Sequence, residues 1–141
     1  ELVLAYLGEA DQGMRAQITG ALSPDVSPED DVRAVARAIA DGIRSPGFRG
    51  CAFLNAVAEY PDPDHPVHRA VLAHREWFLE TVTELLGRAG LEPADAAGRH
   101  FVMLRDGAMA AGCLFDPELV CETFLNGVES LLTAGAVTSR A

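Results

Sequence analysis

The chain has 141 residues and a formal net charge of -10, with 49% hydrophobic and 23% charged residues. This is the composition of one globular domain, which at this length buries about 68–70% of its unfolded surface, and it excludes a disordered chain. The negative charge makes this chain alone a poor candidate for binding nucleic acid, because its surface repels phosphate groups.

Three cysteines, an odd number without a CxxC spacing, occur in apolar helical segments: Cys51, Cys113 and Cys121. Such cysteines are typical of a reducing compartment, so we expect a cytoplasmic protein. No apolar run of transmembrane length is present. The chain begins at Glu1, without Met and already in a helical pattern, so we expect a fragment whose N-terminal part is missing.

Two amphipathic helices are predicted first. The apolar residues of the first recur at helical spacing up to Ser23-Pro24, and they are Val3, Leu7, Ala10, Met14, Ile18 and Leu22. The second begins with Ser27 as N-cap and Pro28 at the first helical position. Its buried stripe is Val32, Val35, Ala36, Ile39 and Ile43.

A short apolar helix is predicted over residues 51–60, between Gly50 and Pro61. After a proline-rich turn, a long helix runs from about Val67 to Ala89, with Pro66 at its first turn and Asp64 or His65 as its cap. So many of its positions are apolar that it must be buried on more than one side.

Two further helices complete the chain, one over about Ala94–Leu114 and one that begins at Asp116-Pro117, with a frayed tail from Thr133. Since no segment shows strand alternation, the predicted fold is all-α. These last two helices are apolar on more than one side, so a second copy of the chain is expected to cover one face. The residues expected there are Ala108, Ala111, Gly112, Phe115, Phe124, Val128 and Leu131. A helix pair buried wholly within the monomer is the alternative.

Metal binding and catalysis are both disfavoured by the sequence. Asp62, Asp64, His65 and His68 have a spacing that a divalent metal accepts, but helix capping and solvation explain them without a metal. A nucleophilic Cys51 requires a histidine and an orienting carboxylate, which no spacing indicates. We therefore predict no metal, no cofactor and no catalytic residue.

Polar residues inside apolar helices suggest a small-molecule site. Asn55 lies in the short helix, and Arg105 and Asp106 lie in the middle of an apolar one. Buried charges are costly unless they are paired, so one interpretation is that Arg105 and Asp106 reach solvent or neighbouring helices. The other makes Asn55 and Arg105 the polar anchors of an apolar pocket. Its walls are Phe53, Leu54, Trp77, Phe78, Thr81, Phe101 and Met109.

One stretch resembles a known family. The run Phe48-Arg49-Gly50-Cys51-Ala52-Phe53-Leu54-Asn55-Ala56-Val57-Ala58-Glu59-Tyr60-Pro61-Asp62-Pro63-Asp64-His65-Pro66-Val67 is similar to a segment of TetR-type transcriptional regulators. There a GCxFxNAxxE(F/Y)-x-D-x-xHP run follows a loop and precedes a long helix. Trp77, the segment Leu104-Arg105-Asp106-Gly107-Ala108 and the final helix extend the similarity over about residues 27–132.

The resemblance implies a six-helix orthogonal bundle that binds an effector and dimerises. The last two helices of two copies would form a four-helix bundle, and operator DNA would be bound by an N-terminal helix-turn-helix absent from this chain. Residues 1–22 would then be the connector helix from that domain. In such a ligand-responsive repressor, Cys51 joins the nine pocket residues above as a ligand contact.

Two other functions remain open. One is a helical dimerisation module with a filled core and no ligand. The other is a small helical enzyme that uses Cys51 or the histidines.

Overall fold

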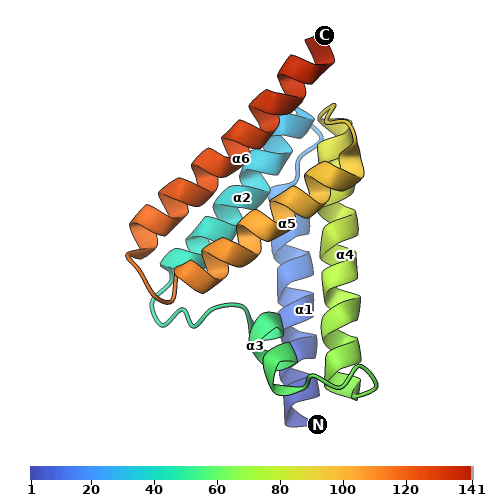
Figure 1. Ribbon diagram of the computed structural model, residues 1–141, viewed down its shortest axis with the longest axis vertical. Helices are drawn as coiled ribbons and strands as arrows, with labels where there is room; N and C mark the ends of the chain where they lie inside the picture. The colour runs from blue at the N-terminus through green and yellow to red at the C-terminus, as the bar shows by residue number, and fades with distance from the viewer. Residues whose placement is uncertain (141) are drawn as a thin grey trace.

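The computed structural model describes the backbone of residues 1–140 and the side chains of residues 1–135, and within them it contains six α-helices and no strand (Figure 1). The helices are α1 (Leu2–Ala21), α2 (Pro28–Arg44), α3 (Ala52–Glu59), α4 (Pro66–Arg88), α5 (Ala94–Ala111) and α6 (Pro117–Arg140). The prediction of an all-α fold is confirmed.

Three helices begin at the caps that the sequence indicates. The Ser27 hydroxyl accepts a hydrogen bond from the backbone N–H of Asp30 at the start of α2. At the start of α4, Nδ1 of His65 accepts from the N–H of Val67 at 3.1 Å. The Asp116 carboxylate accepts from Glu118 N at 2.9 Å before α6. Each cap satisfies an N–H group that the first helical turn leaves without a partner.

The long helix α4 is the centre of the fold, because it contacts α1, α2, α3 and α5. Figure 1 shows α1 and α4 side by side, with the short α3 beside them at the end where the chain begins. Helices α5 and α6 pack against each other, and α6 also packs along α2. Aromatic contacts run through the core from α4 to α6, with ring centroids 6.4 Å apart for Phe78 and Phe101 and 6.1 Å apart for Phe101 and Phe124.

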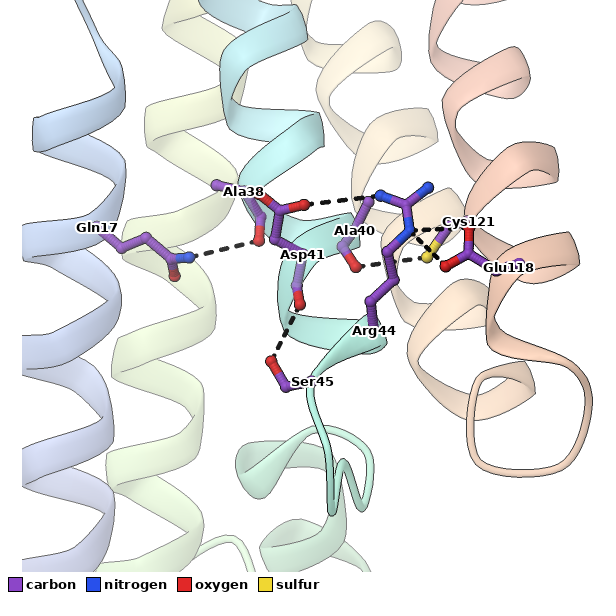
Figure 2. A network of polar contacts seen from close by, with 8 residues as sticks. All are labelled: Gln17, Ala38, Ala40, Asp41, Arg44, Ser45, Glu118 and Cys121. Atoms are coloured by element: carbon purple, nitrogen blue, oxygen red, sulfur yellow. Dashed lines mark hydrogen bonds and ion pairs between the residues drawn. The ribbon is translucent and has the colours of Figure 1, made fainter.

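Polar contacts fasten α2 to its neighbours, as Figure 2 shows. Nε of Arg44 donates to both carboxylate oxygens of Glu118, at 3.2 and 3.0 Å, and so joins the end of α2 to the start of α6. One turn further along α6, the buried Cys121 thiol donates to the carbonyl of Ala40 at 3.4 Å. On the other side of α2, the Gln17 amide of α1 reaches the carbonyl of Ala38. These contacts tie α1, α2 and α6 into one unit.

The last helix differs from its prediction, because α6 continues through residue 133 to Arg140 instead of fraying. Leu131 and Leu132 are buried, and a Cβ at Gly135 would lie 2.5 Å from Cγ of the buried Leu91. This close approach to the α4–α5 connection gives α6 a packing partner at Gly135, and tertiary packing stabilises a helix more than propensity does.

We predict that Gly98→Ala destabilises the protein. A Cβ at this buried glycine of α5 would overlap Thr83 Oγ1 and lie 3.2 Å from Thr83 Cα, so the α4–α5 packing would have to open. Overpacking of this kind costs about 1–3 kcal/mol, which exceeds the helical gain of up to ~1 kcal/mol for Gly→Ala. The free energy of unfolding in urea measures this loss. The matched change Gly13→Ala in α1 has nothing within 4 Å and should stabilise the protein; equal effects at the two positions would contradict the close packing.

Candidate functional site

The predicted ligand contacts lie where α3, α4 and α5 meet, but their exposure differs. Those buried in the chain are Cys51, Phe53, Phe78, Phe101, Arg105 and Met109. Leu54, Trp77 and Thr81 are half-buried, and Asn55 is exposed. The site is therefore an apolar region of the core that contains one fully buried charged group.

Asn55 has a different role from the one predicted. Its Nδ2 donates to the carbonyl of Arg49 at 3.1 Å, so the side chain holds the loop before α3 and does not enter the site. In the same loop Gly50 has φ +91°, and a Cβ there would lie 3.1 Å from Sγ of Cys113. Glycine is needed because L residues rarely adopt this conformation. Thr81 is likewise satisfied within α4, where its hydroxyl donates to the Trp77 carbonyl at 2.8 Å.

Arg105 is the buried charge of the site, with 3% of its surface exposed. Its Nη1 donates to Sγ of Cys51 at 3.3 Å and to Oδ1 of Asp106 at 3.2 Å. The guanidinium carbon lies 5.6 Å from the centroid of the Phe78 ring. Its Nε is buried and has no hydrogen-bond partner. An unmet buried donor costs about 1–3 kcal/mol, so Arg105 is poorly explained by stability alone.

Asp106 reaches a neighbouring helix, as the first interpretation of the charged pair in α5 expects for it. Its oxygens accept from Nη1 and Nη2 of Arg75 in α4, at 3.2 and 2.5 Å. One carboxylate therefore serves two guanidinium groups, and Arg75 already uses both of its terminal nitrogens on it. The pairing leaves Arg105 only partly compensated.

His74 and Asp11 form a second polar contact, which the sequence analysis did not predict. His74 is buried, and its Nδ1 lies 2.6 Å from Oδ1 of Asp11 in α1. The Phe53 ring of α3 stacks on the imidazole with a centroid distance of 3.6 Å and an interplanar angle of 1°. His74 thus joins α4 to both α1 and α3.

Arg15 and Trp77 extend this contact along α1 and α4. The guanidinium carbon of Arg15 lies 4.4 Å from the Trp77 ring centroid, and its Nε donates to both oxygens of Asp11. Trp77 therefore faces α1 through Arg15 as well as lying beside His74, with 5.5 Å between the two rings. A cation over an indole ring adds about 0.5–1 kcal/mol at an exposed site.

Burial lowers the pKa of His74 below its ordinary 6.5, and the hydrogen bond to Asp11 opposes this shift without cancelling it. For Asp11, burial raises the pKa, but hydrogen bonds with His74 and Arg15 outweigh that effect and bring the pKa below 3.8. At neutral pH the pair is therefore a neutral imidazole and a carboxylate. The proton sits on Nδ1, because an ionised Asp11 only accepts.

The residues weighed as a metal site make other contacts in the structure. Nδ1 of His68 lies 2.8 Å from the Tyr60 carbonyl, and the Asp62 carboxylate accepts from the N–H of Asp64. Within the described residues, no three His, Cys, Asp or Glu side chains are grouped to hold a metal ion. In the same part of the chain, no helix combines the length and apolar composition that a membrane crossing requires.

A second candidate site is an apolar groove between α5 and α6, with a volume of about 410 Å³. It is lined by Met103, Leu104, Gly107, Ala108, Ala111, Leu119, Val120, Thr123 and Phe124. Large exposed apolar side chains surround it: Met103, Leu114, Phe115 and Leu119 are 60–75% exposed. Exposed apolar surface of this kind marks an interaction site.

Most residues predicted for a dimer interface lie inside the chain. Buried within it are Ala108, Gly112, Phe124, Val128 and Leu131, whereas Ala111 is half-buried and Phe115 is exposed. The buried ones pack against the chain's own α2, α4 and α5, as Gly112 does where a Cβ would lie 2.7 Å from Ile43 Cγ2. Of the predicted set, Ala108, Ala111 and Phe124 line the groove, as do Met103 and Leu119, which were not in that set.

We predict that His74 makes the free energy of unfolding depend on pH. Below about pH 6.5 the unfolded chain protonates this imidazole while the folded chain, with its lowered pKa, does not, so stability falls as the pH falls toward 5. In His74→Gln this contribution is absent. The free energy of unfolding of wild type and variant, measured at pH 7.5 and 5.5, should therefore differ by less at the lower pH. The exposed His100→Gln serves as control, and the same pH dependence in all three proteins would contradict the assignment.

Comparisons with known proteins place these features in a family. No family model matches the chain. The chain is 22% identical over 107 residues to the HTH-type transcriptional regulator YjdC of Escherichia coli strain K12, a match that covers 76% of this chain and 55% of YjdC. The YjdC of Shigella flexneri matches equally, so the chain spans about half the length of the curated relatives it matches.

A solved structure gives a much stronger match. It is the crystal structure of SCO4454, a TetR-family transcriptional regulator from Streptomyces coelicolor, which is 71% identical to this chain with a TM-score of 0.93. The match covers 96% of this chain and 71% of the SCO4454 chain. Sequence and fold agree over nearly the whole length, which confirms both the six-helix prediction and the resemblance seen in residues 48–67. The chain belongs to the TetR family of transcriptional regulators.

Proposed function

We propose that this chain is the effector-binding and dimerisation domain of a ligand-responsive repressor. The site at Arg105 binds a small molecule, and operator DNA is bound through an N-terminal helix-turn-helix outside this chain, in the cytoplasm. Residues 1–22, which include α1, connect the two domains. The domain uses no cofactor.

The observation that carries the ligand proposal is the buried, under-compensated Arg105 among apolar side chains. Ligand sites combine apolar walls with a few polar groups that fix orientation. Cys51, Phe53 and Phe78 supply such walls from α3 and α4, and Arg105 supplies the polar group. A buried residue with an unsatisfied hydrogen-bond donor lowers the stability of the fold. Such a residue is expected where a function requires it.

The contact from Phe53 through His74 to Asp11 supplies a route from the site to α1. A ligand that favours one position of α3 changes the stacking on His74, and with it the bond that holds α1. The ligand thereby shifts the population between two arrangements of α1. Because operator half-sites require a fixed spacing, a small displacement of the two connectors is enough to release DNA.

The groove between α5 and α6 supports the proposed homodimer. A two-fold contact places the same patch of both copies together, so Met103 and Leu119 of one copy cover the groove of the other. In this arrangement the two pairs of helices form a four-helix bundle. The exposed apolar side chains on this face would then be withdrawn from water.

The ligand proposal is tested by thermal unfolding of the chain with a library of small molecules. Binding at 100 times the dissociation constant adds about 2.7 kcal/mol to stability. Each compound that binds is then tested on the intact protein with its DNA-binding domain, where operator affinity is expected to fall. If no compound stabilises the chain, a dimerisation module without a ligand is the better description.

We predict that Leu119→Glu converts the dimer into a monomer. Leu119 is 60% exposed in the single chain, so the change leaves the monomer fold intact while it places two like charges in the apolar interface. Sedimentation equilibrium at micromolar concentration measures the mass. Leu72→Glu, at an exposed leucine of α4, is the control of equal charge and should stay dimeric. A monomeric wild type, or a dimeric Leu119→Glu, would sink the proposed interface.

A further inference from the structure

We infer that the effector is a monoanionic carboxylate with an apolar body, and that Arg105 binds its carboxylate. This inference rests on the proposed ligand-binding function and names the chemical class of the ligand. It starts from the hydrogen bonds that Arg105 makes and those that it leaves unmade.

Within the described residues, the hydrogen bonds of Arg105 all come from Nη1, which donates to Cys51 and Asp106. Nε is buried without a partner. In a guanidinium group, Nε–H and one N–H of Nη2 point in the same direction, and this edge matches the two oxygens of a carboxylate. Arg105 therefore keeps its bidentate edge unused while its remaining nitrogen fixes its position.

The charges around Arg105 favour a single negative charge. Asp106 is hydrogen-bonded to both Arg75 and Arg105, so this cluster holds two cations and one carboxylate. His74, whose pKa is lowered by burial and less strongly by Arg105, adds no charge at neutral pH. The cluster is left with one uncompensated positive charge, in a chain whose formal net charge is -10. One carboxylate balances it, whereas a dianion would leave a negative charge unpaired in the core.

The surroundings require the rest of the ligand to be apolar. Cys51 and Phe78, which are 4–5% exposed, place a thiol and an aromatic ring next to the guanidinium, and the buried Phe53 of α3 stacks on His74. The thiol accepts only one weak hydrogen bond, so a carboxylate is the stronger partner for this arginine.

The position of α3 gives the ligand a way in. Cys51 is the N-cap of α3, so its bond to Arg105 joins this short helix to α5. Figure 1 shows α3 at one end of the bundle, between the loop that contains Gly47 and Gly50 and the proline turn that precedes α4. In this proposal, a shift of α3 breaks the contact between Cys51 and Arg105 and frees the guanidinium for the ligand, while the contacts among α2, α5 and α6 stay in place.

The test uses the chain itself and a panel of monocarboxylates, from butyrate to decanoate together with benzoate and phenylacetate. Each acid is paired with its primary amide, which has nearly the same shape and no charge. Dissociation constants come from calorimetry at pH 7.5, and midpoints from thermal unfolding. We expect one or more acids to bind wild type and raise its midpoint, and their amides to bind about ten- to a hundredfold more weakly.

Two variants test whether Arg105 causes the preference for an acid over its amide. Arg105→Met removes the cation, while Asp106 keeps its pairing with Arg75, so the variant is expected to fold and to bind acid and amide equally. Arg105→Lys keeps the charge but lacks the bidentate edge, and should weaken acid binding about tenfold. Arg75→Lys is the control from the same cluster, and should retain the preference for the acid.

The outcomes separate this inference from the proposed function. An amide that binds as tightly as its acid, or a preference for the acid that survives both Arg105 variants, overturns the carboxylate assignment and leaves ligand binding intact. If neutral compounds bind and none of the acids does, the carboxylate assignment is likewise overturned while ligand binding stands. If no acid, amide or library compound changes the midpoint of thermal unfolding, both the carboxylate inference and the proposed ligand-binding function are overturned.

Discussion

The contact between His74 and Asp11 is the interaction on which the arrangement of α1 and α3 depends. His74 of α4 contacts both helices, through a hydrogen bond of 2.6 Å with Asp11 of α1 and a parallel ring stack with Phe53 of α3. Because burial keeps the pKa of His74 low, the ring is neutral near pH 7 and donates its Nδ1 proton to the Asp11 carboxylate, and such a hydrogen bond is strong in a site with little water.

This dependence divides the domain into two parts with different tasks. Helices α2, α5 and α6 are joined by apolar packing and by the contacts of Arg44 and Cys121, and the exposed groove lies on the same side. Helix α3 has only eight residues and packs on α1 and α4, and its N-cap Cys51 reaches Arg105 of α5. Under the proposed function, the part formed by α2, α5 and α6 is the assembly surface, and the short α3 is the movable wall of the ligand site, because binding elements are drawn from regions of low local stability.

Much of the fold could be predicted from sequence because its signals are local. Ser27, His65 and Asp116 each mark a helix start by chemistry that acts within one turn. Membership of a family of transcriptional regulators also agrees with the prediction that the chain is not an enzyme. The end of α6 was wrong, because its last turns depend on Leu91, a residue more than 40 positions away.

The site was harder to predict because it depends on which face of each helix meets which neighbour. Periodicity identifies two apolar faces on α5 and α6 but does not say which one the chain itself covers, so Val128, which is buried in the chain, was expected at a dimer interface and the exposed Leu119 was not. The sequence positions of Asp11 and His74 could have indicated their contact. Asp11 lies four residues after Leu7 and seven before Ile18, and His74 lies three after Val71 and four before Phe78, so both polar residues sit in buried stripes. A titratable residue in each of two stripes indicates that they meet.

The contacts of His74 predict that α3 and α1 are energetically coupled through this residue. A double-mutant cycle of Phe53→Leu and Asp11→Ala, followed by urea unfolding, measures that coupling, and the same cycle in a His74→Gln background shows what carries it. We predict a coupling energy of about 1 kcal/mol in the wild-type background and none in the His74→Gln background. Effects that add within about 0.5 kcal/mol while His74 is present would contradict the account.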